Sequence, residues 1–203
     1  MVGLPVEARV LEQLEVRLIE SEAERRRHDQ LLVRHHYLHN AKVVGQVLRY
    51  VVEYHGEWVA VLTFCSAALH LKPRDRFLRW TARQVCERRH LIAQNSRFLV
   101  LPATGRWPNL ASRSLKLVCQ RLAGDWQAQF GHPVLLVETF VDPNRFRGTC
   151  YKASGWEALG QTQGYERAGR ISTSIPSIPR NCGCGRWEPK RWRNWERGNC
   201  HPS

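Results

Sequence analysis

The sequence lacks any long apolar run. No stretch of its 203 residues approaches the roughly eighteen consecutive apolar residues that a membrane-spanning helix needs. Its first residues, MVGLPVEARVLEQLEVRL, also lack the basic start and the unbroken apolar centre of a secretory signal. We therefore expect no membrane contact and a cytoplasmic location.

Acidic residues are scarce relative to basic ones. Asp and Glu total 18 against 31 Lys and Arg, so the formal net charge is +13. A charge of this size says little about the fold, but it predicts attraction to polyanions, nucleic acid above all. The alternative is a basic, solvated face without a polyanionic partner.

Familiar catalytic motifs are missing as well. The chain contains no P-loop, GxSxG, HExxH or GxGxxG sequence, so none of these motifs points to a reaction class. His35 and His39 stand four apart, as a metal pair on one helix face would, but no third ligand follows at a recognisable spacing. We expect no metal site, and a packed or solvent-facing aromatic cluster at residues 28–40.

The cysteines indicate thiols rather than disulfides. Their number, seven, is odd. Four of them lie singly inside apolar segments: Cys65, Cys86, Cys119 and Cys150. This pattern fits buried thiols in a reducing compartment better than a disulfide framework.

The spacing of apolar residues predicts an α/β (α+β) fold. Residues 5–28 have helical spacing, which predicts one amphipathic N-terminal helix. The runs QVLRYVVEY and WVAVLTFCSA, separated by His55–Glu57, predict a β-hairpin. The strand FLVLP, a helix over Leu110–Phe130 with Asn109 as its N-cap, and the buried strand VLLV then follow. Strand, helix and strand form a βαβ-like unit, which favours a mixed sheet over an all-antiparallel one.

A strongly basic helix is predicted from Asp75 to Ile92. Phe77, Leu78 and Val85 would belong to its inner face. Its other face and its N-terminal flank carry six arginines: Arg74, Arg76, Arg79, Arg83, Arg88 and Arg89. Because arginine pairs with phosphate and stacks on bases, this is the best candidate for a nucleic-acid-binding surface. A surface helix paired with acids elsewhere is the equal alternative.

Polar residues gather where the two core strands are expected to end. They are Asn95, Arg97, Glu138, Thr139, Asp142 and, on the following helix, Tyr151. Ligands of α/β sheets usually bind at such strand ends. Apolar surroundings would raise the pKa of Glu138 toward the range of a general base. A buried structural ion pair with Arg97 is the equal alternative.

Two segments together resemble the DruA family of the Druantia anti-phage system, a family also found beside transposases on mobile elements. They are NSRFLVLP with PNLASRSLKLVCQRLAGDWQ, and PVLLVETFVDPNRFRGTCYKASGWEALGQTQGYERAGR. The resemblance covers roughly residues 31–170. It implies a role in phage defence or on a mobile element, with nucleic acid and other defence-system or transposase proteins as partners.

The same order of elements is similar to the N-acetyltransferase (GNAT) superfamily. FLVLP takes the place of its fourth strand, residues 110–130 that of its cofactor-side helix, and VLLVETF that of its fifth strand. This resemblance implies a single domain with a mixed central sheet flanked by helices. It also implies an acetyl-CoA-dependent N-acyltransferase in which Tyr151 protonates the departing CoA thiolate, Glu138 is a candidate base and Asp142 belongs to the same site.

That superfamily holds the CoA pyrophosphate on a Gly-rich loop after the fourth strand. The corresponding loop here is ATGRWPNLAS, in which Gly105, Arg106 and Asn109 could hold an anion. Pro108 removes one backbone donor, and Trp107 would crowd a phosphate. The alternatives to an acyltransferase are a GNAT-like fold used for another ligand or for nucleic acid, and a non-catalytic subunit that binds a partner.

We predict three parts in the chain. Residues 1–30 form the N-terminal helix, and residues 31–170 form the DruA-like, GNAT-like domain. Residues 171–203 are rich in Pro, Cys, Trp and Arg and show neither a helical nor a strand period. This basic tail is expected to be disordered or to result from a frameshift.

Overall fold

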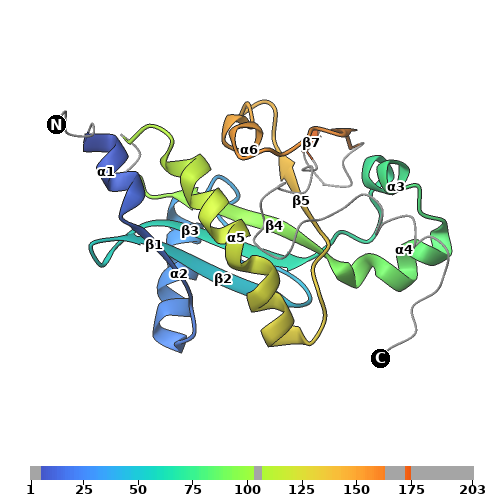
Figure 1. Cartoon of the computed structure of the whole chain (residues 1–203), viewed down its shortest axis with the longest axis horizontal. Helices are drawn as coiled ribbons and strands as arrows, with labels where there is room; N and C mark the ends of the chain where they lie inside the picture. The colour runs from blue at the N-terminus through green and yellow to red at the C-terminus, as the bar shows by residue number, and fades with distance from the viewer. Residues whose placement is uncertain (1–5, 103–106, 163–171, 175–203) are drawn as a thin grey trace.

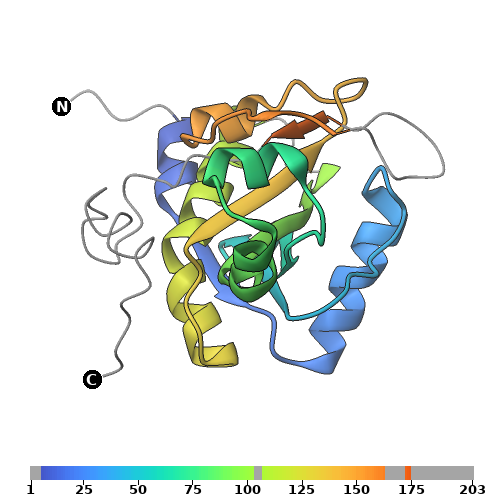
Figure 2. The ribbon, with the colours of Figure 1, turned by 90° about the vertical axis from the view of Figure 1, so that its right-hand side faces the viewer.

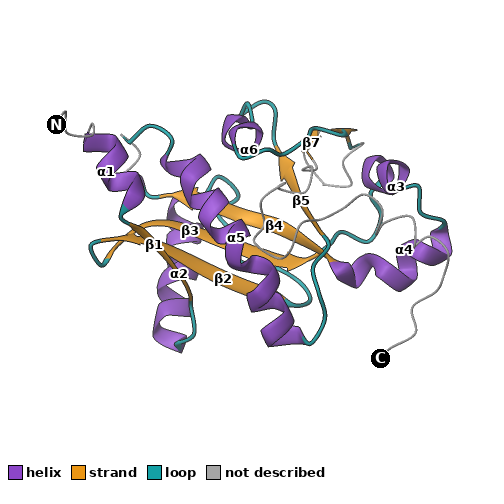
Figure 3. Cartoon of the chain, in the orientation of Figure 1, coloured by secondary structure: helices purple, strands orange, loops and turns teal. Residues whose placement is uncertain are grey.

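A mixed β-sheet forms the centre of the chain (Figures 1 and 3). The computed structural model describes residues 6–102, 107–162 and 172–174. Within these residues the strands form one seven-stranded sheet in the order β1-β2-β3-β4-β5-β7-β6. The strands are β1 Leu14–Leu18, β2 Val47–Tyr54, β3 Glu57–Ser66, β4 Ile92–Val100, β5 Leu136–Val141, β6 Gly160–Gln161 and β7 Ser172–Ser174. The helices are α1 Val6–Glu12, α2 Glu22–His35, α3 Lys72–Leu78, α4 Ala82–Arg88, η1 Arg89–Leu91, α5 Leu110–Phe130 and α6 Thr149–Ala153.

The single helix predicted over residues 1–30 is wrong. A strand interrupts it, because β1 pairs antiparallel with β2 along its whole length. α2 begins only after β1, at the N-cap Ser21, whose hydroxyl oxygen accepts the Glu24 N–H at 3.2 Å. The alternating apolar residues of segment 14–18 fit a strand as well as a helix. The edge of β2 favours the strand, because it offers backbone hydrogen-bond partners to alternate residues of the segment.

The predicted β-hairpin is confirmed. β2 and β3 pair antiparallel, and the turn between them uses left-handed backbone at His55 and Gly56, with φ of 49° and 78°. The side chains from Trp58 to Cys65 are all buried. β3 is therefore an interior strand, and its pairing with β4 fixes where β4 lies.

Helices cover both faces of the sheet. α5 and α1 lie on one face and α2 lies on the other (Figure 2). Leu115, Val118, Leu122 and Trp126 of α5 are buried in the larger hydrophobic cluster, as their helical spacing predicts. Leu32 fixes α2 in a second cluster. Burying each such side chain contributes about 1.5–3 kcal/mol, so the two helices hold the sheet between them.

β4 and β5 are parallel along only a short ladder. It runs from the pair Ile92 and Leu136 to the pair Asn95 and Thr139. Beyond it, β4 continues to Val100 beside β3, whereas β5 turns away and pairs with β7 (Figure 1). The predicted βαβ-like unit is confirmed, and its two strands part to leave an opening.

The basic helix predicted over residues 75–92 is two short helices. α3 ends at Arg79, whose backbone is left-handed with φ 52°, and Thr81 starts α4 through a capping box with Gln84. From Ile92 onward the chain belongs to β4. The capping box satisfies two backbone groups at a new helix start, which outweighs the continuous helical spacing of the apolar residues.

The segment after residue 170 contains a strand, so the prediction of a tail without regular structure is wrong at this point. β7 pairs antiparallel with both β5 and β6. Because this pairing uses backbone groups, the polar sequence STS carries little signal for it. The frameshift prediction concerns mainly residues 175–203, which lie outside the described residues.

The four cysteines singled out in the sequence form no disulfide. Cys65 and Cys119 are buried, as predicted, whereas Cys150 is only half-buried and Cys86 is exposed on α4. Within the described residues, no helix combines the length and the apolar character needed to cross a membrane.

A buried ion pair joins α3 to β5. The side chains of Arg74 and Glu138 are 1% and 0% exposed, and Nη1 of Arg74 lies 3.0 Å from Oε2 of Glu138. The backbone of Ala68 completes the pair, because its carbonyl accepts from Arg74 at 2.9 Å and its N–H donates to Glu138 at 2.9 Å. Burial raises the pKa of the Glu138 carboxyl, and the guanidinium opposes that rise. The assignment of Arg74 to a nucleic-acid-binding surface is therefore wrong.

Breaking this pair should destabilise the fold. Arg74→Met leaves a buried carboxylate without its cation, so the free energy of unfolding in urea should fall by about 3–5 kcal/mol. Arg76→Met, on the exposed side of α3, is the matched control and should change it by less than about 0.5 kcal/mol. The double variant Arg74→Met/Glu138→Leu should recover most of the loss, since neither charge remains. A double variant as unstable as Arg74→Met alone would contradict this account.

Candidate active site between strands β4 and β5

A cavity of about 500 Å³ occupies the opening between β4 and β5. Its walls come from residues 95–100 of β4, residues 139–141 of β5, and the segment 146–151 that leads into and through α6. Ala111 of α5 and the segment 35–39 at the end of α2 complete them. The parting of the two strands thus gathers side chains from distant parts of the sequence around one space.

Asn95, Thr139 and Tyr151 form a hydrogen-bonded cluster in the cavity wall. The Tyr151 phenol donates to Oδ1 of Asn95 at 2.8 Å. The Thr139 hydroxyl lies 3.4 Å from the phenol oxygen and 3.0 Å from the backbone carbonyl of Asn95. Nδ2 of Asn95 donates to the carbonyls of Thr63 and Arg97, both at 3.2 Å, which leaves Oδ1 to accept from Tyr151. The sequence analysis placed these three residues in one polar group, and the fold brings them together.

The Tyr151 phenol keeps its proton at neutral pH. Burial raises its pKa, and the hydrogen bond with Thr139 opposes the rise only in part. The ring packs edge-on against Trp156, with 4.9 Å between centroids, and against Phe98 at 6.4 Å. Tyr151 is therefore a rigidly held proton donor beside the cavity.

Glu138 does not line the cavity. Glu138 and Phe140 point to the face of β5 opposite Thr139; Phe140 still reaches the cavity, but Glu138 is not among its lining residues. Glu138 is instead buried against α3 in its ion pair with Arg74. The ion-pair alternative was the better of the two predictions, but its partner is Arg74 rather than Arg97.

Asp142 and Arg97 support loops beside the cavity. The Asp142 carboxylate accepts the Asn144 N–H at 2.9 Å and lies 3.4 Å from Nε of Arg145, which shapes the turn after β5. Nε and Nη2 of the Arg97 guanidinium donate to the carbonyls of residues 40 and 42, at 2.6 Å and 3.1 Å. These bonds hold residues 40 and 42 beside β4, whereas Asp142 is not among the cavity residues.

His36 is a buried neutral imidazole in the cavity wall. Burial, followed by the charges of Arg97 and His39, lowers its pKa to about 4. Its Nδ1 accepts the Leu38 N–H at 3.2 Å. His36 therefore carries no charge at neutral pH, and its ring packs against Tyr37 with 4.6 Å between centroids.

His39 is held at the cavity in a defined tautomer. Its backbone is left-handed, with φ 46°, which is uncommon for a residue with a side chain. Nδ1 lies 2.9 Å from the carbonyl oxygen of Val33. Because a carbonyl can only accept, Nδ1 carries the hydrogen, and the lone pair of the neutral ring is on Nε2.

The sequence alone indicated no catalytic role for these histidines. The four histidines of residues 28–40 were the available signal, but helical spacing placed His35 and His39 on one helix face. In the structure α2 ends at His35, and a turn carries His39 to the cavity. The expected aromatic cluster is present, because Tyr37 packs against both His36 and Phe146.

The predicted anion-binding loop is only partly described. Gly105 and Arg106 lie outside the described residues. Asn109 occupies the N-cap position of α5, as predicted, but its φ is 59° and its side chain makes no capping hydrogen bond. A usual N-cap has an extended backbone and a side-chain oxygen that accepts a backbone N–H of the first turn, as Ser21 does at α2. Asn109 differs from Ser21 in both respects. Binding of a CoA-type anion at this helix start stays a prediction.

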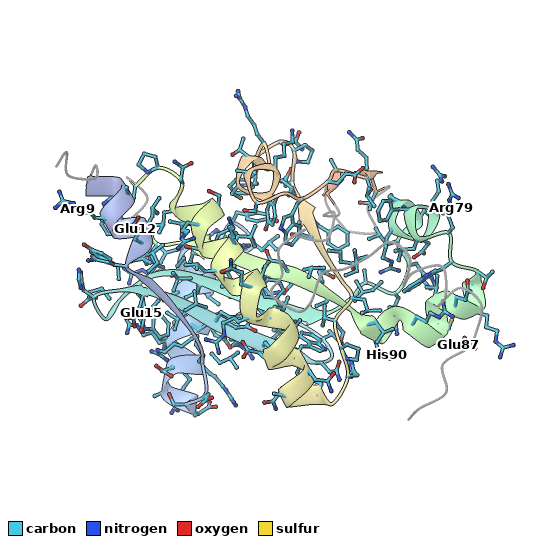
Figure 4. All side chains as sticks on the ribbon, viewed as in Figure 1. Arg9, Glu12, Glu15, Arg79, Glu87 and His90 are labelled. Carbon is cyan, nitrogen blue, oxygen red and sulfur yellow. The ribbon has the colours of Figure 1, made fainter. Side chains whose placement is uncertain are left out.

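Five of the six predicted nucleic-acid-binding arginines have at least part of their side chains at the surface. Arg76, Arg79 and Arg83 are exposed, whereas Arg88 and Arg89 are half-buried. The Arg79 side chain points away from the ribbon at the end of α3 (Figure 4). Nε of the Arg83 guanidinium lies 2.7 Å from Oε1 of an exposed acid one helical turn on, Glu87. This arrangement leaves the nucleic-acid surface a prediction.

Comparison with solved structures identifies the fold. Twenty chains match. One of them is FeeM, an N-acyl amino acid synthase from uncultured soil microbes, with 13% identity and a TM-score of 0.51; the match covers 82% of this chain and 91% of that chain. Another is the aminoglycoside acetyltransferase AAC(6')-Ib with paromomycin and acetyl-CoA (15%, TM-score 0.56, 81% and 93%). The same enzyme with coenzyme A and kanamycin also matches (14%, TM-score 0.55, 81% and 94%). At such low identity these similarities show a GNAT-like fold and nothing more.

Sequence comparison identifies the family. None of the curated proteins compared matches the chain. The family described as Druantia protein DruA matches residues 7–176, which include every described element from α2 to β7. Both resemblances noted in the sequence are therefore confirmed: the chain belongs to the DruA family of the Druantia system and has a GNAT-like fold.

Proposed function

We propose that the chain acts in phage defence, or on a mobile element beside a transposase, by transferring an acyl group from a thioester bound between β4 and β5. The observation that carries the proposal is the cavity in this opening with the protonated phenol of Tyr151 in its wall. The chain would work in the cytoplasm with other defence-system or transposase proteins, where its described cysteines remain thiols.

The cavity offers an acyl thioester both a free strand edge and an apolar lining. Among the described strands, β4 has no partner on its β5 side beyond Asn95, so this edge is available to a ligand that carries amide groups. Apolar side chains, Leu99, Val100 and Val141, line the same space and suit an alkyl arm. One of the structurally similar proteins, AAC(6')-Ib, was solved both with acetyl-CoA and with coenzyme A, which supports this ligand class.

Tyr151 would act as the general acid. A bound thioester supplies an activated carbonyl carbon and a sulfur leaving group. The phenol hydrogen, now directed at Oδ1 of Asn95, would turn to the leaving sulfur. Oδ1 of Asn95 holds the phenol before this transfer, and the Thr139 hydroxyl, 3.4 Å from the phenol oxygen, would donate to the phenolate afterwards.

His39 would act as the general base. Glu138 cannot serve, since it is buried on the other face of the sheet beside Arg74. The Val33 carbonyl fixes the His39 tautomer so that Nε2 can accept a proton from the attacking nucleophile. The proton balance is then complete: Nε2 gains the proton of the nucleophile, and Tyr151 gives its own proton to the sulfur.

The first experiment measures the thioester directly. Acetyl-CoA should bind saturably in calorimetry, and loss of thioester absorbance should report acyl transfer to water or to an added acceptor. Tyr151→Phe should lower the turnover about 10²-fold, because it removes the acid, while the Kd for acetyl-CoA changes less than about twofold. Tyr54→Phe, on the β2–β3 hairpin, is the control. A wild-type chain that binds no acetyl-CoA would show that the proposal is wrong, and binding without turnover would favour a non-catalytic subunit.

The base is tested with a pair of variants that share a backbone conformation. His39 and His55 both have a left-handed φ, 46° and 49°, which asparagine tolerates well. His39→Asn should lower turnover about 10²-fold, and added imidazole should restore part of it. His55→Asn should keep wild-type turnover, because His55 lies in the β2–β3 turn. Equal activity in both variants would exclude His39 as the base.

Nucleic-acid contact through the α3–α4 arginines is the second candidate function. The observation in its favour is the exposure of Arg76, Arg79 and Arg83 in a chain of net charge +13. Half-buried Arg88 and Arg89 would extend the same surface. Such contact does not require the cavity, so it is compatible with acyl transfer.

Charge reversal tests this surface. Arg79→Glu/Arg83→Glu should raise the Kd for a labelled DNA or RNA duplex at least tenfold in a gel shift, and should reduce the salt dependence by about two phosphate contacts. Arg25→Glu/Arg26→Glu, at the start of α2, removes as much charge and is the control. If both double variants weaken binding equally, only net charge matters and the α3–α4 assignment fails.

A further inference from the structure

The cavity contains cationic and imidazole side chains but no described carboxylate. Among its described lining residues there is no Asp or Glu, whereas Arg147, His35 and His39 are present. A polycationic amine needs carboxylates to offset its charge when it leaves water. The charge of this lining therefore suits an acceptor that is anionic.

An aromatic pair stands beside Arg147. The rings of Tyr37 and Phe146 meet edge to face, with 5.3 Å between centroids, and both residues line the cavity. Phe146 is 50% exposed, so one side of its ring contacts Tyr37 and the rest is open to a ligand. The Arg145 guanidinium lies 5.8 Å from the Tyr37 ring centroid. Aromatic faces alternating with arginine are the usual platform for unstacked nucleobases.

Arg147 is placed to contact a phosphate. Arg145, two residues earlier, already pairs with Asp142, at 3.4 Å. Arg147 is exposed, and its guanidinium makes no hydrogen bond or ion pair with another residue in the described part of the chain. It lies directly after Phe146, so a nucleotide whose base stacks on the ring would carry its phosphate within reach of this cation.

We propose that the cavity accepts the end of a single-stranded nucleic acid, with a base stacked on Phe146 and a phosphate bound by Arg147. Binding itself requires no acyl donor. The further step rests on the proposed function: an amino or hydroxyl group of the nucleotide attacks the thioester carbonyl and forms a C–N or C–O bond. The C–S bond breaks, Nε2 of His39 takes the proton of the nucleophile, and Tyr151 protonates the sulfur. This surface is separate from α3–α4, since it is formed by the end of α2 and the loop before α6.

Binding is tested on the full chain without acyl donor. A fluorescein-labelled single-stranded 12-mer of RNA or DNA should bind in an anisotropy titration, and Phe146→Ala and Arg147→Glu should each raise its Kd about tenfold. Phe77→Ala removes a similarly exposed ring, 45% against 50%, from α3 beside the second candidate surface, so a loss of binding in Phe77→Ala but not in Phe146→Ala would assign the binding to α3–α4 and overturn the proposal. Tyr37→Leu should also weaken binding, and near-wild-type thermal unfolding of each variant verifies that it is folded. Wild-type affinity in both Phe146→Ala and Arg147→Glu would overturn the proposal.

The acceptor step has its own readout. With radiolabelled acetyl-CoA, label should appear on the oligonucleotide with wild-type chain and fall at least tenfold with Phe146→Ala. Label on spermidine but not on the oligonucleotide would overturn the acceptor class. Oligonucleotide binding that depends on Phe146, in a chain that consumes no thioester, would support the binding site and reject the proposed acyl transfer. The two proposals can therefore fail separately.

Discussion

The short parallel ladder between β4 and β5 is the constraint on which the rest of the structure depends. Hydrogen bonding joins the strands from Ile92 to Asn95 only, and each strand then follows a different antiparallel neighbour. Both strands keep their backbone groups paired on at least one side, so the parting does not leave them without partners. The cavity, the Tyr151 cluster and the approach of the α2 end all exist because the sheet opens at this point.

The sequence predicted helices and strands well where the spacing of apolar residues fitted only one type of element. α5 has the predicted bounds, because its apolar residues follow a helical spacing and Gly131 stops it. Segment 14–18 and the region around Thr81 were misassigned, because there an apolar spacing that fits a helix competes with strand pairing or with a capping box. Such competition is decided by tertiary partners, and a single sequence does not specify them.

The sequence predicted some residues of the candidate site and missed others, again because tertiary partners decide. Tyr151 comes after one strand-like run and Asn95 shortly before another, so their place in one polar group could be inferred from order alone, although Asn95 lies inside β4 rather than at its end. The partner of Glu138 could not, since Arg74 reaches it through a connection whose path depends on the packing of α3. His39 was also out of reach, because its role follows from a single backbone turn after α2 and a hydrogen bond to Val33. Pairings between loops leave no periodic trace in a sequence.

The connection that carries α3 and α4 has a consequence for how this fold could vary. It joins β3 to β4, which are adjacent antiparallel strands with Ser66 beside Ala93, so geometry alone would allow a short turn in its place. Two ties hold the helices of this connection to the core: Leu71 and Leu78 are buried with Ile92 and Leu136, and Arg74 supplies the countercharge for the Glu138 carboxylate. A chain that loses these helices should retain its fold only if position 138 becomes apolar at the same time. Across related chains, the length of the β3–β4 connection and the charge at position 138 should therefore change together.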